Sequence, residues 1–114
     1  MKKAINPSPE LYKEAEAYAA AVSEKVVIRT YISGNSSDDA RETTDDEKKV
    51  LFALINGALH GILYQHGAAA QSVADAAEFM LMNLIPDANT YDSVYLPIWH
   101  WCKEHSIPWV YPES

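Results

Sequence analysis

The sequence has one cysteine, four glycines and two phenylalanines in 114 residues, and these shortages exclude several kinds of protein. Because Cys102 has no second cysteine to pair with, an intrachain disulfide is excluded. The glycines stand apart at positions 34, 57, 61 and 67, so the chain has no glycine-rich phosphate loop and no dinucleotide-binding fingerprint. Classes of enzyme that depend on those motifs are therefore not expected.

Basic residues are also scarce, with 9 Lys and Arg against 16 Asp and Glu and a net charge of −7. This charge repels phosphate backbones and anionic lipid, so we expect neither direct nucleic-acid binding nor membrane binding, whereas a basic protein would be attracted. Long apolar runs are missing too, since the most apolar stretch, 50–64, is too short to span a bilayer and contains Asn56 and His60. We expect a cytoplasmic protein.

Apolar residues make up 48% of the chain, which is enough for one globular domain spanning residues 1–114. Ser8 and Pro9 predict the start of a first helix, as a capping residue followed by a proline in the first turn. Its apolar residues recur every three or four positions, and we expect it to reach about residue 32. The β-branched residues of 26–32 also fit a short strand, which could pair with 107–111.

Residues 33–46 form a polar, acidic segment that predicts an exposed loop. Thr44 and Glu47 have capping-box spacing, so the second helix should begin near Asp45. This helix is apolar almost all round, which predicts a central position covered by the other helices. Gly57 and Gly61 lower its helix propensity, and we interpret them as points where a neighbouring backbone comes close.

Two further helices complete an expected all-α bundle of four helices around the apolar second helix. The third should span Ala68–Ile85 and end at Pro86, with Met80 and Leu84 on its apolar face. The fourth should begin near Ser93 or Leu96 and run to His105. An extended aromatic tail, 106–114, follows it.

Few side chains suggest catalysis, metal binding or a small-molecule site. Cys102 and His105 share a helix face and have the right types for a zinc site or a thiol nucleophile, but no second ligand pair or orienting carboxylate accompanies them, so we expect ordinary packing. Asn56, His60 and Tyr64 form a polar stripe that could line a small-molecule site or a minor active site, alone or across a homodimer, or a core network. We predict no cofactor, no metal and no catalytic residue.

Two features favour protein binding. The first is a run of six carboxylates, which could be a solvated loop or a negative patch for a cationic partner: Asp38, Asp39, Glu42, Asp45, Asp46 and Glu47. The second is a concentration of aromatic residues outside the expected core, which could seal the bundle or anchor an interface: Tyr91, Tyr95, Trp99, Trp109 and Tyr111. Trp101 should belong to the core.

The segment Asp92-Ser93-Val94-Tyr95-Leu96-Pro97 resembles the part of colicin nuclease immunity proteins that carries two adjacent tyrosines before a proline. Leu96 stands in place of the second tyrosine, and the resemblance covers only these six residues. It implies inhibition of a protein partner. We therefore expect a non-enzymatic binding module, such as a toxin immunity protein or a phage or mobile-element inhibitor. The alternatives are a small-molecule binder and a structural subunit of a phage assembly.

Overall fold

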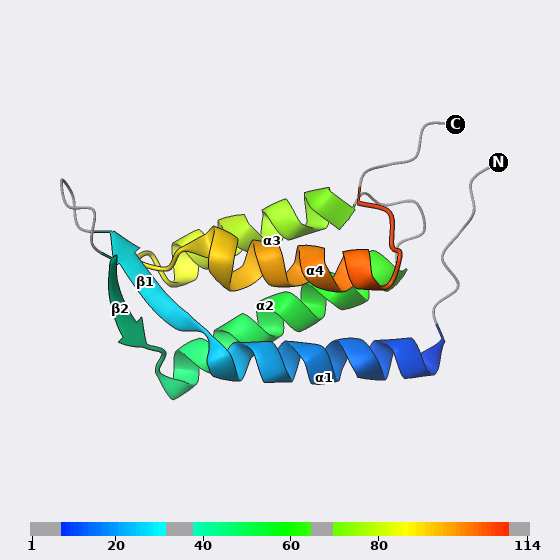
Figure 1. The fold of residues 1–114 in the computed structure, drawn as a ribbon, viewed down its shortest axis with the longest axis horizontal. Coiled ribbons are helices and arrows are strands. Elements are labelled where there is room, and N and C mark those ends of the chain that lie inside the picture. Colours follow the sequence, from blue (N-terminus) through cyan, green and yellow to red (C-terminus); the bar gives the residue numbers. More distant parts are fainter. Residues whose placement is uncertain (1–7, 32–37, 65–69, 110–114) are drawn as a thin grey trace.

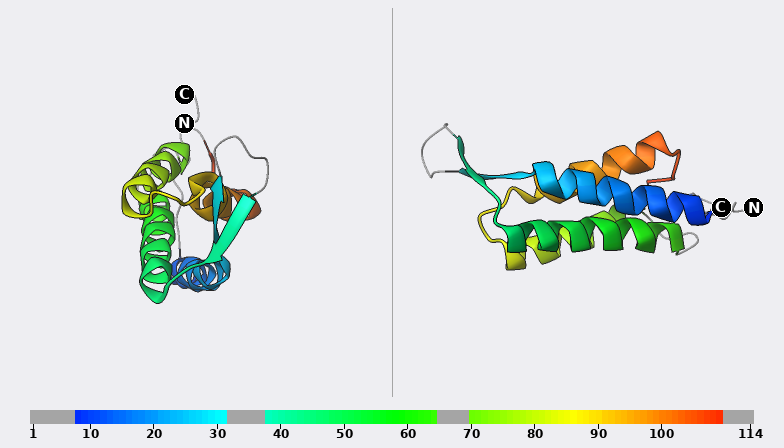
Figure 2. Two further views of the ribbon diagram at one scale, coloured as in Figure 1. Left: turned by 90° about the vertical axis from the view of Figure 1, so that its left-hand side faces the viewer. Right: turned by 90° about the horizontal axis from the view of Figure 1, so that it is seen from below.

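The computed structural model describes residues 8–31, 38–64 and 70–109, and within them the chain forms a bundle of four α-helices (Figure 1). The helices are α1 (Pro9–Lys25), α2 (Asp45–Tyr64), α3 (Ala70–Leu84) and α4 (Leu96–Glu104), with a π-helical turn, η1 (Tyr91–Tyr95), leading into α4. Successive helices run in opposite directions; α1 and α4 lie on one side and α2 and α3 on the other (Figure 2). None of the described helices is both long enough and apolar enough to cross a membrane. The predicted all-α bundle is confirmed.

The first two helices begin where their capping residues predict. The Ser8 hydroxyl accepts a hydrogen bond from the amide of Leu11 at 3.3 Å, and Pro9 occupies the first turn of α1. At α2, the Thr44 amide donates to Glu47 Oε1 at 2.9 Å and the Glu47 amide donates to Thr44 Oγ1 at 3.1 Å. This reciprocal capping box satisfies two backbone donors that the helix itself cannot satisfy.

The structure corrects the predicted length of the first helix. α1 ends at Lys25, and β1 (Val27–Tyr31) follows, pairing antiparallel with β2 (Asp38–Glu42). The β-branched residues after Lys25 prefer the extended backbone, so the strand alternative was correct for this segment. The proposed pairing with 107–111 is wrong. A partner only a few residues away requires a much smaller loop-closure entropy than one near the C-terminus. Much of the predicted acidic loop is therefore strand β2 and the start of α2.

The core lies along one face of α2, which contacts α1, α3, η1 and α4. α1 contributes Ala15 and Ala19, both fully buried, and such small side chains let the two helices pack closely. α4 contributes Trp101, which is 2% exposed and confirms its predicted place in the core. The fully buried large side chains of α2 are Leu51, Ile55, Leu59, Ile62 and Leu63.

The glycines of α2 do not have the role that the sequence suggested. A Cβ at Gly57 would meet nothing within 4 Å, and one at Gly61 would meet only the side chain of Val73, at 4.0 Å. No neighbouring backbone comes close to either position within the described structure, so the interpretation of close helix approach is wrong. Instead Ala53, Gly57 and Tyr64 form an exposed stripe on α2, opposite its core face.

Candidate protein-binding surface

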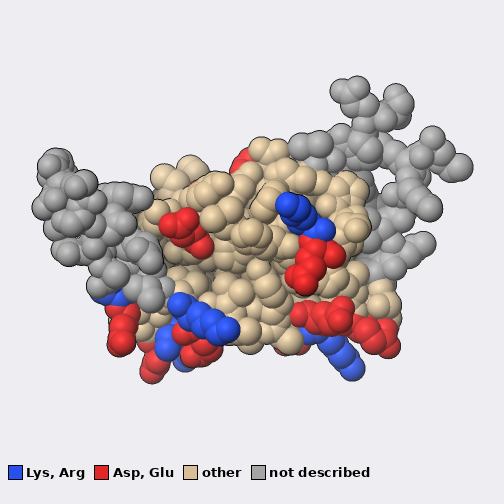
Figure 3. Space-filling model, in the orientation of Figure 1, with Lys and Arg blue, Asp and Glu red and all other residues tan. Residues whose placement is uncertain are grey.

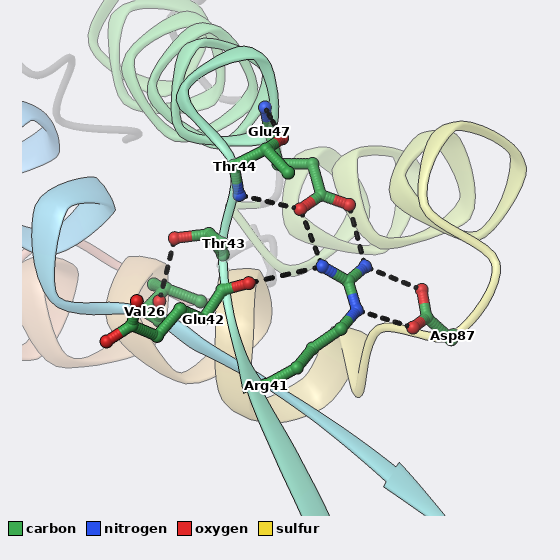
Figure 4. A network of polar contacts seen from close by, with 7 residues as sticks. All are labelled: Val26, Arg41, Glu42, Thr43, Thr44, Glu47 and Asp87. Atoms are coloured by element: carbon green, nitrogen blue, oxygen red, sulfur yellow. Dashed lines mark hydrogen bonds and ion pairs between the residues drawn. The ribbon is translucent and has the colours of Figure 1, made fainter.

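Arg41, at the end of β2, joins three parts of the chain (Figure 4). Its guanidinium donates to both carboxylate oxygens of Glu47, at 2.8 and 2.7 Å, and to both oxygens of Asp87, at 2.9 and 3.0 Å. The planar fork of arginine matches the geometry of a carboxylate, and here it does so on two sides. The hairpin, the first turn of α2 and the segment between α3 and η1 are thereby held together at one end of the bundle.

This network changes the ionisation of its acidic members. The hydrogen bonds from Arg41, followed by that from the Thr44 backbone, lower the pKa of Glu47 from 4.5 to about 2. Hydrogen bonding to Arg41 also lowers the pKa of Asp87. In turn, the bonds to Glu47 and then Asp87 raise the pKa of Arg41. Both carboxylates are therefore charged throughout the neutral and mildly acidic range.

We expect Glu47→Gln to make stability less sensitive to acid. Because the pKa of Glu47 is lower in the folded chain, its contribution is complete above about pH 4.5 and is lost as the pH falls towards about 2. The unfolding free energy of the wild type should therefore fall more steeply over that interval than that of Glu47→Gln. Chemical denaturation at several pH values measures this, with Glu42→Gln as the control at an exposed carboxylate. Parallel curves for wild type and Glu47→Gln would contradict it.

The described members of the predicted acidic run differ in their surroundings. Glu47 is occupied by Arg41 and the capping box, whereas Glu42, Asp45 and Asp46 are exposed. Asp45 and Asp46 lie in the first turn of α2, where negative charge also stabilises the positive end of the helix dipole. The backbones of Asp38 and Asp39 belong to β2, and their side chains lie outside what the structure describes.

Three of the predicted aromatic residues come together. The rings of Tyr91 and Tyr95 are stacked with centroids 5.3 Å apart, and Trp109 meets the ring of Tyr95 edge-on at 5.5 Å. The backbone carbonyl of Trp109 accepts a hydrogen bond from the amide of Gln71 in the first turn of α3, at 2.8 Å. Tyr95 and Trp109 are half-buried, whereas Tyr91 is 52% exposed. We call these three residues the aromatic stack.

Trp99 lies apart from the aromatic stack. Its ring is half-buried, packs edge-on against His100 at 5.1 Å and lies under the ammonium group of Lys103 at 4.8 Å. Tyr111 falls outside the described residues. Of the five aromatic residues predicted to bind a partner, the structure therefore brings three together.

The polar stripe of α2 does not converge on one point. His60 Nδ1 bonds to the backbone carbonyl of Asn56 at 2.9 Å, and its ring packs against Tyr12 at 5.1 Å. Tyr64 is 76% exposed, whereas the His60 ring is held against α1 by its contact with Tyr12. Asn56 Oδ1 is buried and has no hydrogen-bond partner among the described residues.

Cys102 and His105 are both engaged in packing. Cys102 is 1% exposed, and burial raises the pKa of its thiol to about 12. The His105 ring stacks on Trp101 at 4.2 Å, its Nδ1 bonds to the Trp101 carbonyl, and its Nε2 lies 3.9 Å from a carboxylate oxygen of Glu14. A buried thiol with a raised pKa is a poor nucleophile and a poor metal ligand.

One surface was missed by the sequence interpretation. On α3, Ala77 and Leu81 are buried, but Met80 and Leu84, which were expected on the apolar face, are half or more exposed, as are Phe79 and Met82. A shallow groove of about 220 Å³ runs between α2 and α3, and all the residues that line it are apolar. The signal in the sequence was the width of the apolar face of α3, which exceeds what contact with α2 alone covers.

Comparisons with known proteins identify no relative of this chain. The chain matches no protein-family model, and no significant match was found among curated proteins or solved structures. The interpretation of function therefore depends on the surfaces described above.

Proposed function

We propose that this chain is a non-enzymatic protein-binding module that inhibits a basic partner, in the manner of a toxin immunity protein or a phage or mobile-element inhibitor. The observation that carries the proposal is the Tyr91 ring, which is 52% exposed and stacked on Tyr95. Because the Tyr95 ring already packs against one face of the Tyr91 ring, Tyr91 loses little conformational entropy when a partner covers it. Tyrosine with an apolar body and a polar tip is typical of residues that dominate binding energy.

Exposed carboxylates lie at the same end of the bundle as Tyr91. Arg41 holds Asp87, four residues before Tyr91, against the first turn of α2, where Asp45 and Asp46 are exposed (Figures 1 and 4). Elsewhere on the face shown in Figure 3, charged groups form separate clusters around a largely uncharged centre. In the proposed mechanism the carboxylates accelerate association with a basic surface, and the aromatic stack slows dissociation.

The partner can be identified by photo-cross-linking through the surface that is proposed to bind it. A photo-reactive phenylalanine analogue replaces Tyr91 in the native host, and after irradiation the cross-linked protein is identified by mass spectrometry. The control carries the same analogue at Ala17, an exposed position on α1. We expect a basic protein to cross-link from position 91 and not from 17, and its own activity to fall when the purified chain is added. If the same proteins were cross-linked from position 17 as from position 91, the proposal would be contradicted.

Once that partner is identified, we expect the double variant Asp45→Asn/Asp46→Asn to associate with it about tenfold more slowly at low salt. The difference should be much smaller at high salt. The matched control is Glu10→Gln with Glu16→Gln, which changes the net charge equally through exposed residues of α1. Tyr91→Ala should instead raise the dissociation rate. These rates are measured by stopped-flow fluorescence. Equal, salt-independent association of both double variants would refute electrostatic steering.

A second candidate is a small-molecule site at Asn56 and His60, which is favoured by the buried, unpartnered Oδ1 of Asn56. A bound donor group there would satisfy an oxygen that otherwise carries a desolvation penalty. The cross-linking experiment separates the two candidates, because a small-molecule binder would give no specific protein adduct at position 91.

A further inference from the structure

A hollow of about 520 Å³ opens between the last two turns of α1 and the first two turns of α2. Figure 2 shows these two helices side by side when the bundle is seen from below. The volume lies in the range of small-molecule sites, roughly 300–1,000 Å³. None of the residues that line the hollow belongs to the aromatic stack or to the polar stripe of Asn56, His60 and Tyr64, so the hollow is a separate candidate site.

α1 contributes a small, partly polar wall to the hollow. Ala20, Ser23 and Glu24 are three and four residues apart, so they lie on one face of the helix. Ser23 is 3% exposed, and its hydroxyl donates to the Ala20 carbonyl at 3.0 Å. A hydroxyl has two acceptor sites besides its one donor, so the Ser23 oxygen is still able to accept a hydrogen bond from a group in the hollow.

α2 contributes the charges and one aromatic ring. Its lining residues, Asp45, Lys48, Lys49 and Phe52, are again three and four residues apart and share one face of the helix. The ammonium group of Lys48 lies 3.4 Å from a carboxylate oxygen of Glu24, and this ion pair joins the two walls. Phe52 is half-buried and packs against the core, which fixes an apolar surface inside the hollow.

Two charged groups of the hollow remain without a partner. The side chains of Asp45 and Lys49 form no ion pair with any described residue, whereas Lys48 and Glu24 neutralise each other. Asp45 and Lys49 are one helical turn apart, about 6 Å along the α2 axis at ~1.5 Å per residue, and Phe52 follows about one turn further on. The hollow therefore offers one free carboxylate, one free ammonium group and an apolar surface, in that order along α2.

From these paired opposite charges beside an apolar surface, we infer that the α1–α2 hollow binds a small zwitterion, a free amino acid with a large apolar side chain. Its ammonium group binds Asp45 and the Ser23 oxygen, its carboxylate binds Lys49, and its side chain packs on Phe52 and Ala20. A ligand with a single charge would leave either Asp45 or Lys49 unmatched. The inference does not depend on the function proposed for the aromatic stack.

Titration of the full chain with free amino acids tests this inference. The probes are leucine, methionine, phenylalanine and tryptophan, and binding is followed by amide shift changes in NMR spectra. We expect saturable changes centred on the residues that line the hollow. The amino acid that binds most tightly is then compared with its N-acetyl derivative, which lacks the ammonium group, and with its amide, which lacks the carboxylate. Each derivative should bind at least about fivefold more weakly.

Variants locate the binding site. Ala20→Phe fills the space between the two walls and Lys49→Gln removes the free ammonium group, so each should weaken binding at least about fivefold. The matched controls are Ala21→Phe and Lys13→Gln, which make the same changes at exposed positions of α1 that do not line the hollow. Each control should change binding less than about twofold. Thermal unfolding checks that every variant is folded, and two independent variants of the hollow keep the result interpretable.

Three outcomes would overturn the inference. The first is the absence of saturable shift changes with all four amino acids at concentrations up to about 10 mM. The second is equal binding of the amino acid and either derivative, since one charge would then be enough. The third is equal binding by wild type, Ala20→Phe and Lys49→Gln. Shift changes centred on Asn56 and His60 in that case would assign the ligand to the second candidate site described above.

Discussion

Trp101→Ala should destabilise the domain by about 3–5 kcal/mol, because it removes the largest side chain of the core and leaves a cavity. Trp101 is 2% exposed, its ring stacks on His105 at 4.2 Å and lies 6.5 Å from the ring of Tyr18. The Tyr18 hydroxyl donates to the Pro97 carbonyl at 2.6 Å, so the cavity would also loosen the contact between α1 and α4. Urea denaturation followed by circular dichroism measures the loss.

The matched control for that substitution is Trp99→Ala on the same helix. Trp99 is half-buried and its main polar neighbour is the ammonium group of Lys103, so its removal should cost much less, about 1 kcal/mol. Domains of this kind are stable by only about 5–15 kcal/mol, so Trp101→Ala should leave a measurable unfolded population where Trp99→Ala does not. Equal losses from the two substitutions would show that Trp101 is not the centre of the core.

Cys102 should react with a thiol reagent at least a thousandfold more slowly in the folded chain than an exposed cysteine does. Burial raises the pKa of its thiol from 9.0 to about 12, which alone lowers the thiolate fraction at pH 8 by about that factor. Because the side chain is 1% exposed, the reagent is also excluded sterically. Release of the coloured product from an aromatic disulfide reagent gives the rate.

The control for this reaction is a cysteine at Ala17 in a chain that also carries Cys102→Ser. It should react within seconds to minutes, whereas wild-type Cys102 should react only as fast as the domain opens. Folded Cys102 reacting within tenfold of that control would mean that the α4 face is accessible, and would restore the thiol hypothesis. With the expected result, labelling of Cys102 becomes a direct measure of unfolding.

Local signals in the sequence predicted much of the fold. Ser8 and the pair Thr44 and Glu47 marked two helix starts, because capping involves groups only three residues apart. The end of α1 was harder to predict, since the competing helix and strand preferences after Lys25 were settled by pairing with β2. The sequence offered no pattern that linked the two strands in register.

The candidate site was less predictable, because its contacts join distant residues. Arg41 and Asp87 are 46 positions apart, and nothing in the spacing of either one predicts the other. The aromatic residues could be named, but only the folded chain shows that Tyr91, Tyr95 and Trp109 meet and that Trp99 does not. Likewise, the apolar face of α3 was evident, but how far α2 would cover it depended on the crossing of the two helices.

Trp109 fastens the end of the described chain to two other elements. Its ring packs edge-on against Tyr95 in the aromatic stack, and its carbonyl accepts a hydrogen bond from the Gln71 amide in the first turn of α3. The first amides of a helix have no acceptor within the helix itself, so a residue far along the chain satisfies one of them here. Displacement of Trp109 would therefore disturb the aromatic stack and the start of α3 together.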